Sequence, residues 1–233
     1  MALAVFRFPL IVVESTLSTL MALPRLPHLT QENAALRNEL ASRQLELAQL
    51  REAVRHATRS QELLQALEGF ELADSSSKPI VASILGRTTI PSQHVVLLDK
   101  GTRHGVVTDS ILLEAGGVVG RVLDAHATTS FAILITDPNS RIACVVERSR
   151  ENGLLVGTGH HLCRLIYLDL EADVVEQDRI LTAGLGGPFP KGIMLGTVVK
   201  VLRDERSAQT TAWVRPAVTL GRVEEVVCLP PPS

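Results

Sequence analysis

His94 and Asp99 are residue types that, together with a serine or cysteine nucleophile, carry out hydrolysis in proteases. Such a nucleophile is framed by a glycine-rich turn, and no serine or cysteine of the chain has that frame. A trypsin-like protease therefore has little support. We expect His94 on a strand, facing solvent or a neighbouring carbonyl, and Asp99 in a turn.

Histidine and cysteine side chains are the usual metal ligands, but their spacing here does not suit a metal site. His160 and His161 adjoin each other, and neighbours on a strand point to opposite faces, so we expect them in a surface loop. Cys144, Cys163 and Cys228 form no Cys-x-x-Cys or Cys/His pattern. We expect each cysteine to be a small buried residue of a strand, with a disulfide between two of them as the alternative. No metal, no cofactor and no catalytic residue is predicted.

The stretch GLGGPFPKG, residues 184–192, resembles a phosphate-binding loop only superficially. It lacks the lysine-hydroxyl pair and the following helix of such a loop. Its glycines and prolines favour a rigid turn that holds Phe189 in place. The residues assigned to this structural loop are Gly184, Gly187, Phe189, Pro190 and Gly192.

Composition limits both the fold and the partners. Of the 233 residues, 45% are hydrophobic, which is enough to bury a core in one or two domains. The net charge of -2 provides no basic face, so nucleic acid is not expected as a partner. Aromatic residues make up only 3%, so valine, leucine and isoleucine are expected to fill the core.

Residues 80–229 are expected to form the main folded region. Short β-branched runs alternate there with turn signals, and no usable amphipathic helix separates them. This pattern predicts a mainly β fold of two small antiparallel β-barrel subdomains behind an N-terminal coiled coil. The pair Asn152-Gly153 predicts a hairpin turn, and Gly116-Gly117 predicts another less strongly.

Residues 26–68 have the heptad pattern of a coiled-coil helix. Apolar residues recur at alternating spacings of three and four, and no glycine or proline interrupts the chain from Thr30 to Gly69. The predicted dimerisation residues are Leu29, Asn33, Leu36, Leu40, Leu47, Leu50 and Val54.

Asn33 is a polar residue within this apolar seam. An amide there is tolerated best when it meets its own copy, which favours a parallel homodimer. Two alternatives stay open: Asn33 is a local cap in the first turn, or the single helix folds back on the β region. Arg43 and Gln61 also interrupt the seam, so the coil is expected to be marginal.

Residues 1–25 are predicted to be a membrane-proximal amphipathic segment. Arg7 and Glu14 make a poor membrane span, since one central charge costs about 2.5 to 3.5 kcal/mol on insertion scales. An apolar stripe after Pro9 suits a helix on a membrane surface or one that continues from a span; the alternative is an ordinary helix packed on the protein. The stripe consists of Leu10, Val13, Leu17 and Leu20. Residues 69–79 are a predicted linker, and residues 230–233 a tail.

Six fragments occur along the chain in this order: ENAALRNEL, LLDKGTRHGV, GGVVGRV, LITDPNSRIACVV, ENGLLVG and RILTAGLGGPFPKGIMLGTV. Together, in this order after a coiled coil, they resemble the MreC family of bacterial rod-shape-determining proteins. The resemblance covers Gln31 to about Val201 and continues weakly to Leu229. Two departures are Gln177-Asp178 in place of a Gly-Asp pair and Thr182-Ala183-Gly184 in place of Thr-Ser-Gly.

This resemblance implies a non-enzymatic scaffold of the peptidoglycan elongation machinery that is anchored in the cytoplasmic membrane. Its coil dimerises, and its two barrels face the periplasm or the cell exterior. The implied partners are a class B penicillin-binding transpeptidase, which it binds and activates, MreD and, indirectly, MreB. Partner binding could include pairing with an edge strand.

The clean membrane span that the family resemblance implies is missing. The true start lies upstream of Met1, or this copy works unanchored. A periplasmic adaptor of an efflux or secretion system is the alternative function, although its coil is usually a hairpin inserted between two β halves.

Overall fold

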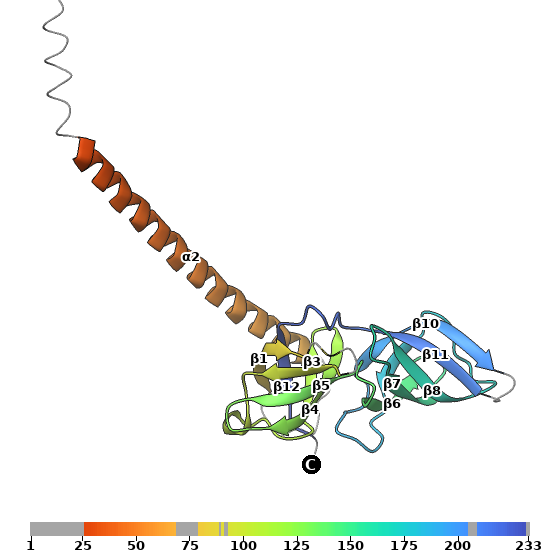
Figure 1. Cartoon of the computed structure of the whole chain (residues 1–233). Helices are drawn as coiled ribbons and strands as arrows, with labels where there is room; N and C mark the ends of the chain where they lie inside the picture. Colours follow the sequence, from red (N-terminus) through yellow and green to blue (C-terminus); the bar gives the residue numbers. More distant parts are fainter. Residues whose placement is uncertain (1–25, 69–78, 89, 91–92, 205–208, 232–233) are drawn as a thin grey trace, which may run out of the picture. The chain divides into compact units, whose positions relative to one another are not determined.

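The computed structural model describes residues 26–68, 79–88, 90, 93–204 and 209–231 (Figure 1). The segment predicted at 1–25 and nearly all of the predicted linker 69–79 lie outside the described residues. The chain divides into two compact units, residues 1–57 and 58–233.

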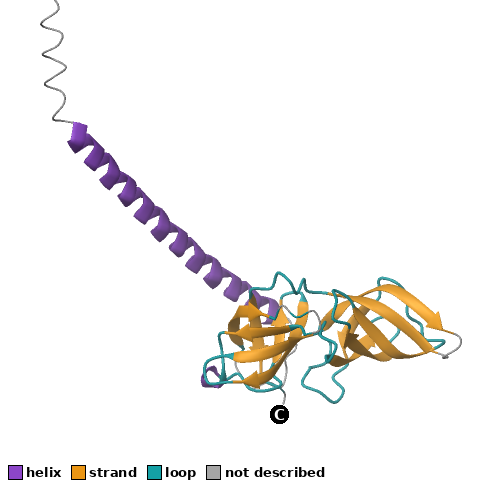
Figure 2. Cartoon of the chain, in the orientation of Figure 1, coloured by secondary structure: helices purple, strands orange, loops and turns teal. Residues whose placement is uncertain are grey.

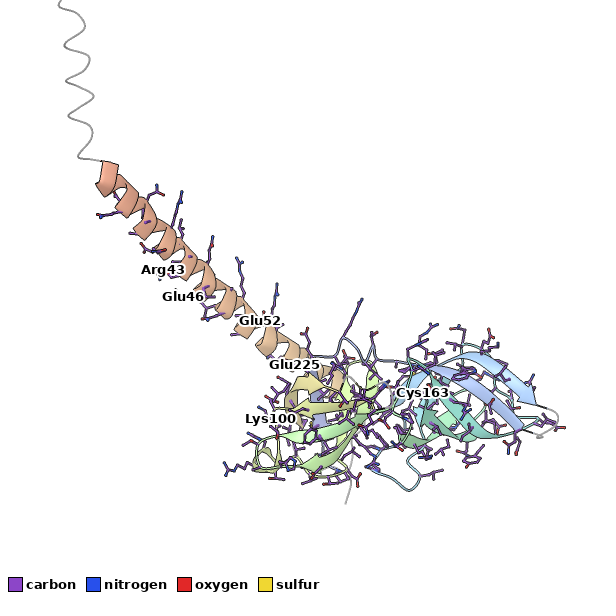
Figure 3. The ribbon with its side chains drawn as sticks, viewed as in Figure 1. Arg43, Glu46, Glu52, Lys100, Cys163 and Glu225 are labelled. Carbon is purple, nitrogen blue, oxygen red and sulfur yellow. The ribbon has the colours of Figure 1, made fainter. Side chains whose placement is uncertain are left out.

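Helix α2 spans Leu26–Glu68. It is rich in alanine, leucine, glutamate, glutamine and arginine, the residues that lose least rotamer freedom in a helix. Its described side chains are exposed, and Arg43 forms an ion pair with Glu46 one turn later, at 3.3 Å (Figure 3). Within the described residues, no helix combines the length and apolarity needed to cross a membrane.

The first barrel is a closed antiparallel sheet in the order β1-β12-β3-β4-β5-β2. Its last strand comes from the C-terminal end of the described chain, so the sequence of the second barrel lies between the fifth and sixth strands of the first. The strands are β1 (Ile80–Arg87), β2 (Val95–Leu98), β3 (Ile111–Glu114), β4 (Gly117–Ala125), β5 (Ser130–Leu134) and β12 (Glu225–Leu229); a short 3-10 helix, η2, spans Thr102–His104.

The second barrel lies in the sequence between β5 and β12, and its order is β10-β11-β8-β7-β6-β9. Figure 2 shows the strands of both barrels. The predicted fold class, mainly β with two small antiparallel barrels and an N-terminal helix, is confirmed. The strands are β6 (Arg141–Val146), β7 (Asn152–Gly157), β8 (Cys163–Asp169), β9 (Arg179–Thr182), β10 (Met194–Asp204) and β11 (Gln209–Pro216).

Aliphatic residues fill the core, as the composition predicts. One buried cluster belongs to the first barrel, around Val96, Leu98 and Leu112. A second cluster joins Ile111 and Ile135 of the first barrel region to Leu195 and other residues of the second barrel. This continuous apolar packing stabilises the two barrels against each other.

Backbone contacts between the barrels are also close. A Cβ atom on Gly117 of β4 would lie 2.2 Å from the carbonyl oxygen of Met194 in β10. A Cβ atom on Gly157 of β7 would lie 2.0 Å from the carbonyl oxygen of Asp137, in the connection after β5. Both positions therefore need glycine, because any side chain would push the two backbones apart.

The hairpin turn predicted at Asn152-Gly153 is wrong in position. Asn152 pairs with Val145, and the turn precedes it. Arg150, at φ 65°, supplies the left-handed residue that an Asn-Gly pair would otherwise supply. The turn predicted at Gly116-Gly117 is present but begins at Ala115, because Gly117 already pairs with Glu114.

Candidate functional site

The predicted dimerisation residues lie along α2, and their apolar side chains are more than half exposed. The exposed fractions are 54% for Leu36, 62% for Leu40, 51% for Leu47, 57% for Leu50 and 64% for Val54. Asn33 is exposed as well. The side chain of Leu29 is not among those that the structure describes. An exposed apolar stripe on a helix, even one that Arg43 interrupts, is typical of an interaction surface.

His94 and Asp99 have separate partners. His94 directly precedes β2, and its Nδ1 lies 2.7 Å from the hydroxyl oxygen of Thr136. Asp99 instead accepts a hydrogen bond from the backbone N–H of Ser83 at 2.7 Å and forms an ion pair with Lys100 at 3.0 Å (Figure 3). The two side chains therefore serve local structure at different places.

The three cysteines lie in strands β6, β8 and β12, and all are buried and free, which confirms the prediction for Cys144, Cys163 and Cys228. Burial raises the pKa of each thiol to about 12. Cys163, labelled in Figure 3, donates a hydrogen bond to the carbonyl oxygen of Ile135 at 3.4 Å. The described residues contain no group of three or more potential metal ligands, and His160 and His161 lie in the exposed loop between β7 and β8.

The glycine-rich residues lie in the loop that connects β9 to β10. Gly184 and Gly192 have φ values of 70° and 91°, in the left-handed region that glycine adopts without strain. Thr182 closes the loop: its hydroxyl donates to the carbonyl oxygen of Pro190 and accepts a hydrogen bond from the backbone N–H of Ile193. Phe189, 9% exposed, packs into the core, while Gly187 is exposed.

A charged cluster that the sequence analysis missed holds the segment between β8 and β9. Arg148 donates hydrogen bonds to both carboxylate oxygens of Asp178 and to Asp173. Hydrogen bonds from Arg148 hold the pKa of each of these two carboxyl groups below its usual range. The adjacent Gln177 has a φ of 71°, at the position where the family pattern has glycine.

Comparisons with known proteins agree on one family. The sequence profile of the family described as "Rod shape-determining protein MreC, barrel core" matches residues 84–230. The cell shape-determining protein MreC of Escherichia coli is 31% identical over 202 residues, which cover 85% of this chain and 53% of that protein. The MreC protein of Listeria monocytogenes is 29% identical over 206 residues, which cover 85% of this chain and 68% of the Listeria protein. The chain thus spans about half the length of the Escherichia coli relative.

Solved structures share the fold. The crystal structure of MreC from Pseudomonas aeruginosa matches with a TM-score of 0.63 and 28% identity, covering 66% of this chain and 99% of that one. A structure described as the major periplasmic domain from the cell shape-determining filament MreC matches with a TM-score of 0.58 and 18% identity, covering 66% of this chain and 96% of that one. A complex between a penicillin-binding protein and MreC from Helicobacter pylori matches with a TM-score of 0.52 and 16% identity, covering 65% of this chain and 98% of the matched one. The last two structures are 18% and 16% identical to this chain, so their similarity shows a shared fold and nothing more.

The profile match spans both barrels, and a 31% identical relative covers most of the chain. In the part of the chain that the structure describes, twelve strands form two closed sheets, and the matched region reaches across both. The chain belongs to the MreC family of rod shape-determining proteins.

Proposed function

We propose that this chain is a non-enzymatic scaffold of the peptidoglycan elongation machinery, a parallel homodimer through α2 that binds and activates a penicillin-binding transpeptidase. The observation that carries the proposal is the exposed leucine seam on a helix that precedes two closed barrels. A scaffold needs a stable body and a means of pairing, and these two parts supply them.

Pairing of α2 is favoured by the burial of its seam. Complete burial of one leucine side chain stabilises by about 1.5 to 3 kcal/mol. Five described seam side chains are more than half exposed, so pairing two helices would bury ten. Lost translational and rotational freedom opposes this gain by about 4 to 15 kcal/mol, and the ordering of interface side chains adds to that cost. Asn33 facing its own copy would favour the parallel, in-register pairing.

The barrels are the proposed binding surface for the transpeptidase. The Helicobacter pylori MreC protein is described in a complex with a penicillin-binding protein. Strand addition at a free edge, considered from the sequence, has no support here, because each described strand of the two sheets is paired on both sides. We therefore assign binding to the loops and outer faces of the barrels.

Dimerisation would make the binding bivalent. Two heads on one coil hold a second partner at high effective concentration, so modest contacts produce useful avidity. If the heads bind one transpeptidase conformation more tightly, they activate it by shifting its population toward that conformation. The family resemblance adds MreD and, indirectly, MreB as further partners. A periplasmic or extracellular position at the cytoplasmic membrane follows from the same resemblance and from the periplasmic domain described for a relative.

A matched pair of leucines tests the pairing. Leu40 and Leu45 are both 62% exposed in the single chain, but only Leu40 lies on the seam. Leu40→Asn should shift the full chain from dimer toward monomer in sedimentation equilibrium, and Leu45→Asn should not. The same two variants should then be compared for binding to the organism's own immobilised penicillin-binding transpeptidase, where Leu40→Asn should lose avidity. Equal sedimentation of both variants, or a monomeric wild-type chain, would contradict the pairing.

A further inference from the structure

A cavity of about 680 Å³ lies between the two barrels. Its described lining comes from five segments: the end of β1, the start of β2, the end of β5 with Thr136, the β7–β8 loop, and the end of β11 with the connection to β12. Its volume is in the range of sites that hold ligands the size of a short peptide segment. Because its walls come from five separate segments, no local sequence signal marks it.

The walls combine apolar and basic side chains. The aliphatic part consists mainly of Val95 and Leu220, which are half-buried, backed by Val96, Leu134 and Val218, which are buried. Among the described residues, the lining also contains two arginines and three histidines and no aspartate or glutamate. A hydrophobic surface edged by positive charge without any negative charge is complementary to an apolar ligand that carries carboxylates.

The basic side chains of the lining differ in whether they already form hydrogen bonds with other residues of the protein. Arg87 donates hydrogen bonds to the carbonyl oxygens of Leu220 and Val223, so it anchors one wall of the cavity. By contrast, the side chains of Arg215, His160 and His161 have no hydrogen-bond or ion-pair partner among the described residues, and all three are exposed at the cavity. These donors are available to a ligand.

We propose that this cavity binds an acidic peptide segment of a partner protein, with an aliphatic side chain on the Val95–Leu220 surface and carboxylates at Arg215 and the His160-His161 pair. A small inorganic anion would leave the aliphatic surface uncovered. The described residues of the lining include no phenylalanine, tyrosine or tryptophan, so they offer no stacking platform of the kind that a nucleotide base uses. This site is independent of helix pairing and does not rest on the scaffold function.

The test uses the full chain and a fluorescein-labelled peptide of alternating glutamate and leucine, followed by fluorescence anisotropy. The peptide should bind saturably, and Arg215→Glu should weaken binding about fivefold to tenfold, since it replaces an attraction by a repulsion. The separate variant Thr219→Trp changes an exposed residue of the cavity lining. It should weaken peptide binding more than Arg215→Glu does, because the indole fills the cavity without changing its charge. Thermal melts establish that each variant is folded.

The matched control is Arg164→Glu, which changes the same charge on the neighbouring strand β8 at an exposed position outside the lining. It should leave peptide binding unchanged, and a lysine-leucine peptide should not bind. The proposal is overturned by any of four results: no saturable binding, equal loss in Arg164→Glu, no loss in Thr219→Trp, or equally tight binding of a labelled oligothymidylate.

Discussion

Asp178 accepts a hydrogen bond from Nε of Arg148 at 2.8 Å, and its side chain is only 6% exposed. The pair joins the β6–β7 turn to the segment that precedes β9. Asp178 also accepts a hydrogen bond from the backbone N–H of Val175 at 2.9 Å. One buried carboxylate thus holds an irregular segment of the second barrel in place.

Acid should weaken the fold through Asp178. Its folded-state pKa lies below its unfolded value, first because of the hydrogen bond from Arg148. The stabilisation is therefore full above the unfolded pKa of about 3.9 and is lost as pH falls through the folded pKa. Asp178→Asn should lower the free energy of unfolding by about 1 to 2 kcal/mol at neutral pH and by less at about pH 3.

Urea unfolding at these two pH values measures the effect. The control is Glu147→Gln, which breaks an exposed ion pair of 3.1 Å with Arg179 and should cost no more than about 0.5 kcal/mol. A loss for Asp178→Asn that is the same at both pH values would contradict the role of its charge.

Gln177→Gly should stabilise the protein. At a φ of 71°, a side chain with a Cβ atom is strained, and glycine removes the strain. We expect a gain of about 0.5 to 1 kcal/mol in the free energy of unfolding, because strain relief exceeds the added flexibility of the unfolded chain. The matched change Gln209→Gly, at a β11 residue outside the left-handed region, should destabilise instead. Both variants losing stability equally would contradict the explanation.

The cysteines should be unreactive in the folded chain. Their thiols are buried, and their pKa values of about 12 leave almost no thiolate at about pH 8. Ellman's reagent should therefore react slowly with the native protein and fully after denaturation. Thr128→Cys places one thiol at an exposed position and should react at once. Rapid reaction of the wild-type protein would contradict the burial of its cysteines.

The raised thiol pKa values also predict alkaline destabilisation. Their contribution to stability is full below the unfolded pKa of about 8.5 and is lost as pH rises toward about 12. The urea midpoint should therefore fall above about pH 8.5.

Asn33→Cys should report the register of the helix pair. In a parallel, in-register dimer the two introduced thiols meet across the seam and oxidise readily to an intermolecular disulfide. Leu45→Cys, on the outer side of the helix, should crosslink slowly. Non-reducing gel electrophoresis distinguishes the two. An antiparallel dimer or an unpaired helix would leave both variants equally slow.

Local patterns predicted the helix, the strands and the two barrels, whereas the order of the strands within each barrel could not be predicted. The heptad spacing of Leu36, Leu40 and Leu47 is visible because the helix repeats along the sequence. The return of β12 to β1 and β3 of the first barrel joins segments far apart in the chain. The pairing of Arg148 with Asp178 and the five-segment cavity are likewise properties of the closed fold. The turn after β6 was misplaced because Arg150 adopts a left-handed conformation that its residue type does not predict.

The most direct test of the scaffold proposal is crosslinking and affinity capture of the C-terminally tagged full chain in its native cells. The predicted result is recovery of a penicillin-binding transpeptidase together with MreD, with a reduced yield for Leu40→Asn and an unchanged yield for Leu45→Asn. Recovery of a transporter and an outer-membrane channel, with no enzyme of wall synthesis, would contradict it.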